Sequence, residues 1–297
     1  MNKHVIINDV GPRDGLQNQP RVLEIHQRVE LINALVAAGV PEIEVGAFVS
    51  PKAVPAMAGT DKVFAQLKGD TVFSALIPNM RGYQSAKEAG VPLSSLVVAV
   101  SNTMNEKNIG MNTDTALVAC QGVFAQAQQD NSEVQAYVAT AWECPFEGEV
   151  SQADVIDVSA RLLAIGAKRI VVADTIGAAN PANVTSLMNA LVEKFGAERF
   201  ACHFHDTRAM GLANVYAALT AGVRRFDASI AGLGGCPFAP GASGNVATED
   251  VVMMVEQMGF VTGIDMKKLL TASDLAIQLT GTAKGGKAKL WIEKYLS

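Results

Sequence analysis

Short runs of apolar, often β-branched residues alternate along this chain with longer stretches in which apolar residues recur every three or four positions. The first pattern predicts buried strands and the second amphipathic helices, and their alternation is typical of parallel strands joined by crossover helices. In the stretch 26–39, for example, apolar residues from Val29 to Val36 lie on one helical face before Gly39 ends the helix. Eight strands are predicted: His4–Val10, Glu42–Ala47, Thr71–Ile77, Leu96–Ser101, Glu133–Thr140, Arg169–Ala173, Arg199–His205 and Arg225–Ile230.

This series of units predicts an α/β fold, a (β/α)8 barrel. Such a barrel occupies about 250 residues, so residues 1–297 are expected to form a single domain in which 261–297 add a C-terminal helical cap. The main rival is a doubly wound open sheet, which requires a glycine-rich phosphate-binding turn after its first strand. The chain has GPRDGLQN at that point, which favours the barrel.

Composition narrows the class of partner. Hydrophobic residues make up 49% of the chain and charged residues 18%, which supports a large core and excludes disorder. A net charge of -5 offers no basic field for nucleic acid or anionic lipid, so we expect a small-molecule partner, with neither nucleic acid nor membrane. Four cysteines without CxxC spacing indicate reduced thiols, and the absence of a signal-like apolar run makes the cytoplasm the expected location.

Two histidines stand out in the seventh predicted strand. His203 and His205 are two residues apart, so both point to the same face at the end of the strand where a barrel builds its active site. A pair of converging imidazoles suggests metal ligands, although a single inward histidine is more often a core residue. Asp206 could orient one ring or cap the next helix, and capping is the safer interpretation for Thr207.

The loop after the first strand carries Arg13 and Asp14, a pair that is often no more than an exposed ion pair. In a closed barrel, however, this loop lies beside the seventh and eighth strands, so Asp14 can join the two histidines. An oxygen and nitrogen ligand set with open positions suits Mg2+ or Mn2+ better than a closed zinc site.

Several further acids lie where a barrel places its chemistry. Glu44 alternates with Glu42 on the second strand, so it is either solvated on the outside or functional on the inside. Asp9, Asp174 and Glu249 lie at strand ends or beside a loop, and each could act in acid–base chemistry or support a neighbour. For Asp174 the alternative is a cap of the following helix.

A glycine-rich loop, residues 232–245, follows the eighth strand and resembles an active-site lid of a barrel enzyme. It contains Cys236, whose sequence neighbours include no cation that would activate the thiol. Asn245 could give a carbonyl oxygen to a metal or cap a helix beginning near Thr248, and the sequence alone favours the cap.

Six segments together resemble the motifs of 3-hydroxy-3-methylglutaryl-CoA lyases, over about residues 5–275. The RDG and HxH elements are shared by a wider superfamily of metal-dependent barrel lyases and synthases, whereas the long glycine-rich loop is specific to the lyases. The segments are DVGPRDGLQN, EVGAFVSPK, ECPFEG, ADTIG, HFHDT and GLGGCPFAPGASGNVATED.

This resemblance implies a metal-assisted retro-Claisen cleavage of a 3-hydroxyacyl-CoA to acetyl-CoA and acetoacetate, with Mg2+ or Mn2+ as cofactor, coenzyme A as part of the substrate, and a homodimer as the assembly. It implies metal ligands Asp14, His203, His205 and Asn245, which overrides the cap at Asn245; catalytic residues Arg13, Asp174, Cys236 and Glu44; supporting residues Asp9, Gln17 and Glu249; and coenzyme A contacts from Lys107 and Asn108 in the loop after the fourth strand.

Chemistry assigns the roles within this set. A metal chelated by the substrate hydroxyl lowers the pKa of that hydroxyl, and Asp174 can then accept its proton. Arg13 would neutralise charge that grows on the thioester oxygen, and Cys236 would return a proton to the departing enolate.

The chain departs from the family at three places. EVGAF replaces ETTSF or EVTSF, so Gly46 and Ala47 lack two hydroxyls near the acyl pocket; Arg208 opens the segment after HDT; and Pro20 replaces a lysine. These changes imply a reshaped site for the distal end of the acyl group, so a citramalyl-type or longer branched substrate is an alternative.

Two other classes compete. Acetyl-CoA-condensing synthases of the isopropylmalate or homocitrate type use the same metal set, but they usually lack the cysteine loop and often carry a C-terminal regulatory domain. A non-enzymatic barrel is a further alternative, because a fold does not fix a function.

Overall fold

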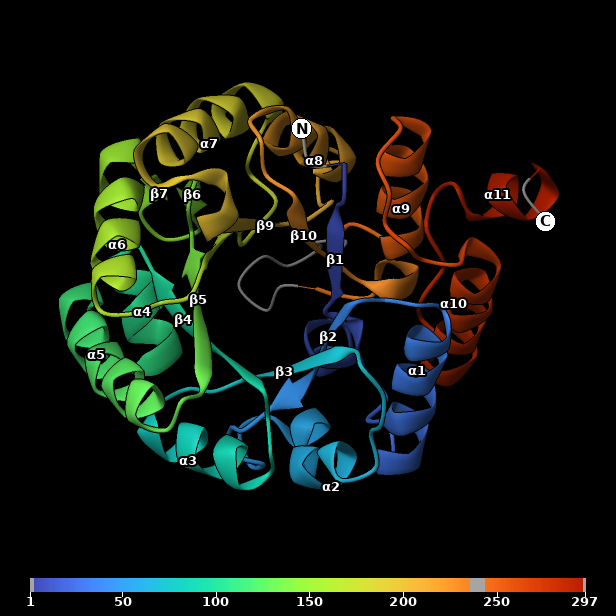
Figure 1. Ribbon diagram of the computed structural model, residues 1–297, viewed down its shortest axis with the longest axis horizontal. Helices are drawn as coiled ribbons and strands as arrows, with labels where there is room; N and C mark the ends of the chain where they lie inside the picture. The colour runs from blue at the N-terminus through green and yellow to red at the C-terminus, as the bar shows by residue number, and fades with distance from the viewer. Residues whose placement is uncertain (1–2, 236–243, 296–297) are drawn as a thin grey trace.

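The computed structural model describes residues 3–235 and 244–295 and forms the closed barrel that the sequence predicts (Figure 1). Neighbouring strands are parallel throughout, in the order β1-β10-β9-β8-β5-β4-β3-β2. The strands of the barrel are β1 (Ile6–Asp9), β2 (Glu42–Ala47), β3 (Val72–Leu76), β4 (Leu93–Ala99), β5 (Glu133–Ala139), β8 (Ile170–Asp174), β9 (Phe200–Phe204) and β10 (Arg225–Ala228).

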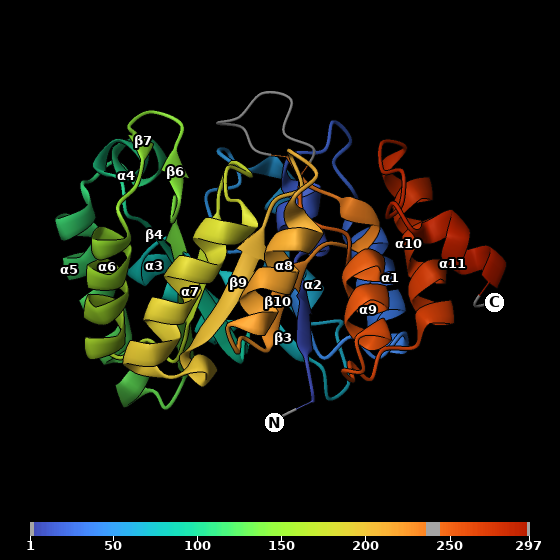
Figure 2. The same ribbon diagram turned by 90° about the horizontal axis from the view of Figure 1, so that it is seen from above.

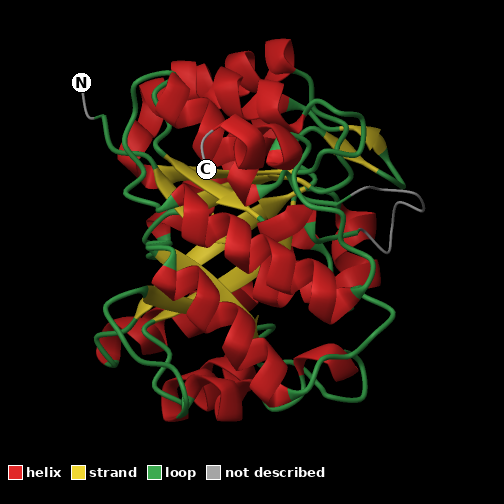
Figure 3. Ribbon diagram, turned by 90° about the vertical axis from the view of Figure 1, so that its right-hand side faces the viewer, coloured by secondary structure: helices red, strands yellow, loops and turns green. Residues whose placement is uncertain are grey.

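Helices surround the strands, as Figure 3 shows in red around yellow. This enclosure explains why strands such as β2 are buried along their whole length on both faces. The helices are α1 (Ile25–Ala37), α2 (Thr60–Phe64), α3 (Met80–Glu88), α4 (Asn102–Ile109), α5 (Thr113–Gln129), α6 (Gln152–Ala164), α7 (Pro181–Phe195), α8 (Gly211–Thr220), α9 (Thr248–Gln257), α10 (Met266–Thr280) and α11 (Lys289–Tyr295).

The fourth strand begins earlier than predicted. The prediction was Leu96–Ser101, whereas β4 runs from Leu93 to Ala99. Ser94 and Ser95 have low strand propensity, but both pair with β5, and the hydroxyl of Ser95 accepts a hydrogen bond from the Gln135 side chain at 3.0 Å. Tertiary pairing therefore overrides local preference here.

A short antiparallel hairpin, β6 (Glu143–Cys144) with β7 (Gly148–Glu149), was not predicted. It stands beside the loops at the carboxyl ends of the barrel strands (Figure 2). The carboxylate of Glu147 accepts a hydrogen bond from the backbone of Thr103, which joins the hairpin to the first turn of α4.

The C-terminal helices lie on the outside of the barrel. Helix α10 packs against α1 and α9, and α11 follows at the edge of the molecule (Figures 1 and 2). No helix within the described part of the chain is long and apolar enough to cross a membrane.

The amino-terminal end of the barrel interior is closed by a buried polar cluster. Glu42 of β2 pairs with Arg169, Nη2 to Oε2 at 2.8 Å, and also with Arg225. Arg169 further donates to Gln135 at 2.5 Å. This cluster leaves the carboxyl-terminal end of the barrel, where Glu44 points, for the functional site.

Candidate metal and catalytic site

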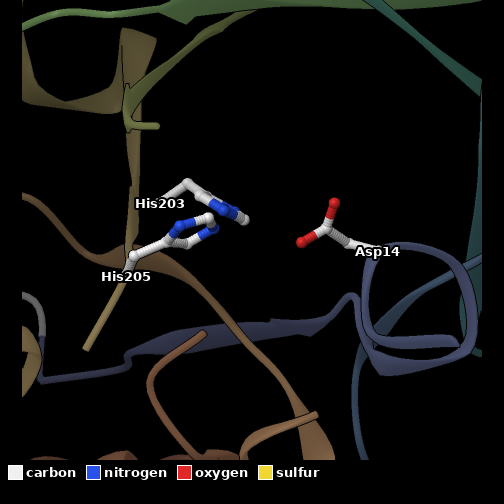
Figure 4. A group of neighbouring side chains, drawn as sticks. All are labelled: Asp14, His203 and His205. Atoms are coloured by element: carbon white, nitrogen blue, oxygen red, sulfur yellow. The ribbon is translucent and has the colours of Figure 1, made fainter. Parts of the chain in front are cut away.

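Asp14, His203 and His205 converge at the carboxyl end of the barrel (Figure 4). Their candidate ligand atoms all lie within 4.8 Å of one another. His203 is on β9 and His205 follows it, while Asp14 lies in the loop after β1; the three meet because β10 alone separates β1 from β9. The spacing of the two histidines and the closure of the barrel predicted that these three side chains lie together, and the structure confirms that they do.

A tight turn delivers Asp14 to this point. Residues Gly11–Gly15 form a π-helical turn in which three successive backbone amides bond the carbonyl of Val10. A side chain at Gly15 would come within 2.7 Å of the Leu233 side chain, so the loop after β1 requires glycine to approach the loop after β10. The close approach brings Asp14 into the barrel mouth.

The protonation states of this cluster suit a cation. Burial would raise the pKa of Asp14, but Arg13 and the two histidines outweigh it and hold that pKa at about 2. Burial, with the neighbouring His203, lowers the pKa of His205 to about 4, which leaves a neutral imidazole. Burial also acts to lower the pKa of His203, but its hydrogen bond to Asp227 and that residue's charge raise it overall. One carboxylate and two imidazoles fit a divalent ion with open positions.

Asn245 lies against this cluster and does not cap a helix. Its side-chain nitrogen donates to Oδ2 of Asp14 at 2.8 Å and to the carbonyl of Leu233 at 3.1 Å. Helix α9 begins at Thr248 with no side-chain cap, so the capping prediction is wrong. The buried Oδ1 of Asn245 has no hydrogen-bond partner, which leaves an oxygen available, although ligation through it requires the amide to turn.

Arg13 lies between the metal cluster and Glu44. Its Nε donates to Oε2 of Glu44 at 2.5 Å, and its Nη1 donates to Oδ1 of Asp14 at 2.6 Å. The Oε1 atom of Glu44 is buried without a partner. Burial raises the pKa of Glu44 despite the opposing charge of Arg13. Two carboxylates thus fix one guanidinium at the mouth of the barrel, which places Glu44 on the inside.

Asp174 ends β8 and is held by the loop that follows. Its carboxylate accepts hydrogen bonds from the backbone amides of Ala178 at 2.8 Å and Ala179 at 3.2 Å. Burial raises its pKa to about 6, although these two amides and the charge of Arg208 oppose the shift. The group can therefore exchange a proton near neutral pH.

The chain matches one known protein family over almost its full length. The family described as HMGL-like matches residues 4–276, nearly the whole chain. The chain belongs to the HMGL-like family.

Relatives in and around this family share both sequence and fold with the chain. It is 43% identical over 274 residues to the hydroxymethylglutaryl-CoA lyase of Bacillus subtilis, covering 91% of each protein. It is 42% identical to the (R)-citramalyl-CoA lyase of Chloroflexus aurantiacus, covering 91% of this chain and 89% of that one. The structure of an HMG-CoA lyase from Acinetobacter baumannii, in complex with coenzyme A and 3-methylmalate, has a TM-score of 0.92 at 38% identity and covers 96% of this chain and 94% of that one.

Arg208, one departure from the usual HMGL-like pattern, does not line the cavity. Its guanidinium donates to the carbonyl of Gly177 at 2.9 Å and also to the carbonyls of Ala178 and Ala179. It therefore holds the loop that binds the carboxylate of Asp174, and any influence on the acyl group is indirect. Asp206, two residues before Arg208, binds the start of the next helix: its carboxylate accepts a hydrogen bond from the backbone amide of Gly211, the first residue of α8.

Thr207 is not the cap that the sequence suggested. Its hydroxyl is buried without a hydrogen-bond partner. A further departure, Gly46, has a packing reason, since a side chain there would come within 2.5 Å of the Thr60 hydroxyl and 2.9 Å of the Arg28 guanidinium. A hydroxyl-bearing residue at this position requires the surroundings to move.

A cavity of about 180 Å³ opens over the metal cluster. Its lining includes Gln17, Asn108 and Tyr137. Lys107 and Asn108 were predicted in a loop but lie on α4, which begins after Ser101 caps it through its hydroxyl. Asn108 faces the cavity, whereas the ammonium of Lys107 lies 4.8 Å from the ring centroid of Phe146 on the hairpin.

Asp9 and Glu249 bind the backbone around the site. Asp9 accepts from the amide of Gly11 at 2.8 Å and from the hydroxyl of Thr248 at 2.6 Å. Glu249 accepts from the amides of Ala231 at 3.1 Å and Gly286 at 2.8 Å. Both acids are buried and contact no group of the metal cluster directly.

Two residues that the sequence analysis missed lie beside His203. Asp227 of β10 contacts its Nδ1 atom at 3.0 Å, and Tyr137 of β5 donates to the same carboxylate at 2.7 Å. The rule applied to Glu44, that an acid within a strand is solvated outside or functional inside, applies equally to Asp227 in RFDAS and could have found it. Cys236 lies outside the described residues.

Proposed function

We propose that this protein is a carbon–carbon lyase that cleaves 3-hydroxy-3-methylglutaryl-CoA, or a closely related 3-hydroxyacyl-CoA, to acetyl-CoA and a keto acid. The observation that carries the proposal is the cluster of Asp14, His203 and His205 directly beside the guanidinium of Arg13. Relatives with this fold and about 40% identity are named for that reaction.

The cluster fits Mg2+ or Mn2+, held by Asp14, His203 and His205, with Asn245 as a further ligand once its amide turns. Such an ion supplies positive charge that lowers the pKa of the substrate hydroxyl. The residues of the chain then have to accept the hydroxyl proton, stabilise the enolate and return a proton to its carbon.

Asp174 is proposed as the group that accepts the hydroxyl proton. Its pKa, raised by burial to about 6, leaves it ionised at neutral pH yet basic enough to take up a proton. The two amides that bind its carboxylate keep it at the end of β8. Its chain neighbours Ala173 and Thr175 line the cavity, whereas Asp174 is not among the described lining residues.

Arg13 is proposed to stabilise the enolate. When the carbon–carbon bond breaks, negative charge moves onto the thioester oxygen, and a preorganised donor there lowers the barrier. Glu44 and Asp14 each bind one edge of the guanidinium, so its orientation is set before substrate arrives. The burial of Arg13 strengthens the interaction.

Proton return to the enolate carbon is proposed for Cys236, on the sequence alone. For coenzyme A, Asn108 at the cavity rim is the better supported contact, since the Lys107 ammonium already lies over the ring of Phe146. We further infer a homodimer, because barrels of this type commonly pair, and a cytoplasmic location, because the described cysteines, Cys120, Cys144 and Cys202, are free thiols.

A citramalyl-CoA or longer branched substrate remains the second candidate. The (R)-citramalyl-CoA lyase of Chloroflexus aurantiacus is 42% identical to this chain, against 43% and 40% for the hydroxymethylglutaryl-CoA lyases of Bacillus subtilis and Pseudomonas mevalonii. The metal and guanidinium chemistry is the same for both substrates, so the distinction depends on the residues that line the cavity over the metal cluster, and the described lining contains neither Gly46 nor Ala47.

A product assay distinguishes these candidates. Purified protein with Mn2+ is given 3-hydroxy-3-methylglutaryl-CoA, citramalyl-CoA and a longer branched 3-hydroxyglutaryl-CoA, and the products are identified by mass spectrometry. We expect acetyl-CoA and acetoacetate from the first compound, with a large loss in Cys236→Ala. Preferred cleavage of another compound reassigns the substrate, and no cleavage of any of the three overturns the proposal.

A further inference from the structure

Asp227 lies inside the barrel, almost fully buried, and accepts hydrogen bonds from three side chains on three different strands. Asn8 of β1 donates to Oδ1 at 2.8 Å. Tyr137 of β5 and the Nδ1 atom of His203 both contact Oδ2, at 2.7 Å and 3.0 Å. A buried carboxylate is costly unless its oxygens are hydrogen-bonded, and here each oxygen has a donor.

The strand register explains why these groups meet. Asn8 is paired with Asp227 between β1 and β10, and Asp227 is paired with His203 between β10 and β9. The three side chains therefore form one row across adjacent strands. Tyr137 completes the set from β5, on the far side of β8 and β9 in the barrel, and its ring also lines the cavity over the metal cluster.

We propose that Asp227 is a positioning residue for His203. By accepting the Nδ1–H of the imidazole, it fixes the tautomer in which Nε2 carries the lone pair that can reach an ion shared with Asp14 and His205. Asn8 and Tyr137 keep the carboxylate in place. A histidine that binds a metal through one nitrogen is generally oriented through the other, and this chain supplies the orienting group.

The alternative is that Asp227 only stabilises the barrel interior, as Glu42 does at the other end of the barrel. Glu42 is also a buried barrel acid, but its partners are Arg169 and Arg225 and it touches no residue of the metal cluster. The two acids therefore form a matched pair: both stabilise the barrel interior, and only Asp227 contacts a candidate ligand.

Asp227→Asn separates the two roles. If the new amide nitrogen faces His203, it donates to Nδ1 and forces the proton onto Nε2, which then cannot bind a metal. If the amide oxygen faces His203 instead, the imidazole keeps an acceptor for Nδ1–H but loses the negative charge that makes Nε2 a stronger metal ligand. Either orientation weakens metal binding while preserving the shape of the side chain.

The first experiment measures the Mn2+ dissociation constant by electron paramagnetic resonance. We expect Asp227→Asn to raise it 10–100-fold, the usual effect of losing such an orienting group. Glu42→Gln should lower the melting temperature and leave the Mn2+ dissociation constant within about twofold of the original. An unchanged dissociation constant in folded Asp227→Asn, or an equal rise in Glu42→Gln, overturns the proposal.

The second experiment needs no variant and decides the matter if Asp227→Asn does not fold. The chain has only four histidines, so 15N-labelled imidazole nitrogens can be resolved individually by NMR. At pH 8 without metal, we expect His203 to carry its proton on Nδ1. A proton on Nε2 and none on Nδ1 in the unaltered protein overturns the proposal.

The inference rests on the proposed function only through the metal ion. Both measurements are made without acyl-CoA, so a failure of the lyase reaction with an intact Mn2+ site rejects the function and not the role of Asp227. Conversely, an active lyase in which Asp227→Asn binds Mn2+ normally rejects the positioning role alone.

Discussion

Arg13 donates its Nε hydrogen to Oε2 of Glu44 across 2.5 Å, inside the mouth of the barrel, where both side chains are buried. Glu44 therefore fixes the plane of the guanidinium, and the opposite edge is held by Asp14. A donor that is aimed before substrate binds avoids reorganisation during the reaction.

Replacing Glu44 by glutamine tests this contact. We expect Glu44→Gln to lower kcat by at least tenfold with a smaller effect on KM, because the guanidinium loses its charged anchor. The matched control is Glu42→Gln, two residues earlier on the same strand, which should keep kcat near the original value. Equal losses of kcat in the two variants would contradict a specific role of Glu44, because loss of either negative charge on β2 would then have the same effect.

The pH dependence of cleavage should report Asp174. Burial raises its pKa to about 6, and the proposed role requires the ionised form, so kcat/KM at saturating Mn2+ should fall as the pH drops below about 6. Asp174→Asn should remove most of the activity and also this acid limb. A kcat/KM that stays level down to pH 5 contradicts the assignment.

Arg208 should tune this same group. Its positive charge lowers the pKa of Asp174, so Arg208→Met should move the acid limb to higher pH. The loop from Gly177 to Ala179 also loses the hydrogen bonds from Arg208 and keeps only the one from Asn214 among the described side-chain donors, and we expect kcat at pH 8 to fall about tenfold. Arg199→Met is the control, since Arg199 donates to a backbone carbonyl at the opposite end of the barrel. An acid limb that stays in place after Arg208→Met argues against the coupling.

Asp9 should make the fold less stable at higher pH. Burial raises its pKa from 3.8 to about 7, so between these values the folded chain keeps a proton that the unfolded chain has lost, and stability falls as the pH rises through 7. In Asp9→Asn the amide oxygen can still accept from the Gly11 amide and the amide nitrogen can donate to the Thr248 hydroxyl, so both contacts survive without a titrating group. The melting temperature of Asp9→Asn, relative to that of the original protein, should therefore rise between pH 5 and pH 8. For Asp61→Asn, at an exposed position, this difference should not change with pH. A constant difference at both pH values rules out this contribution.

Much of the fold could be predicted because the signals are local and repeated. Strand and helix periods identify the eight units, and ring closure alone brings Asp14 to the histidines of β9. Period-two spacing was enough for His203 and His205, since His203 lies on β9 and His205 directly follows the last residue of that strand.

The remaining features depend on contacts that no local pattern contains. Tyr137 and Asp227 are 90 residues apart in the chain and meet only inside the closed barrel. The sequence around Asn245 suggested a helix cap. Its actual partner, Asp14, is 231 residues away in the chain, so no local pattern could show this contact. Arg208 was expected to affect the acyl pocket, but three backbone carbonyls that become accessible only after folding take up its guanidinium.

The most direct test of the account is whether carbon–carbon cleavage depends on an ion at Asp14, His203 and His205. The protein is freed of metal with a chelator and titrated with Mn2+ while bound metal and released acetyl-CoA are measured together. We expect no cleavage without metal, full activity at one ion per chain, and neither binding nor cleavage in a folded His205→Ala variant. Undiminished cleavage by the metal-free protein would contradict the central claim.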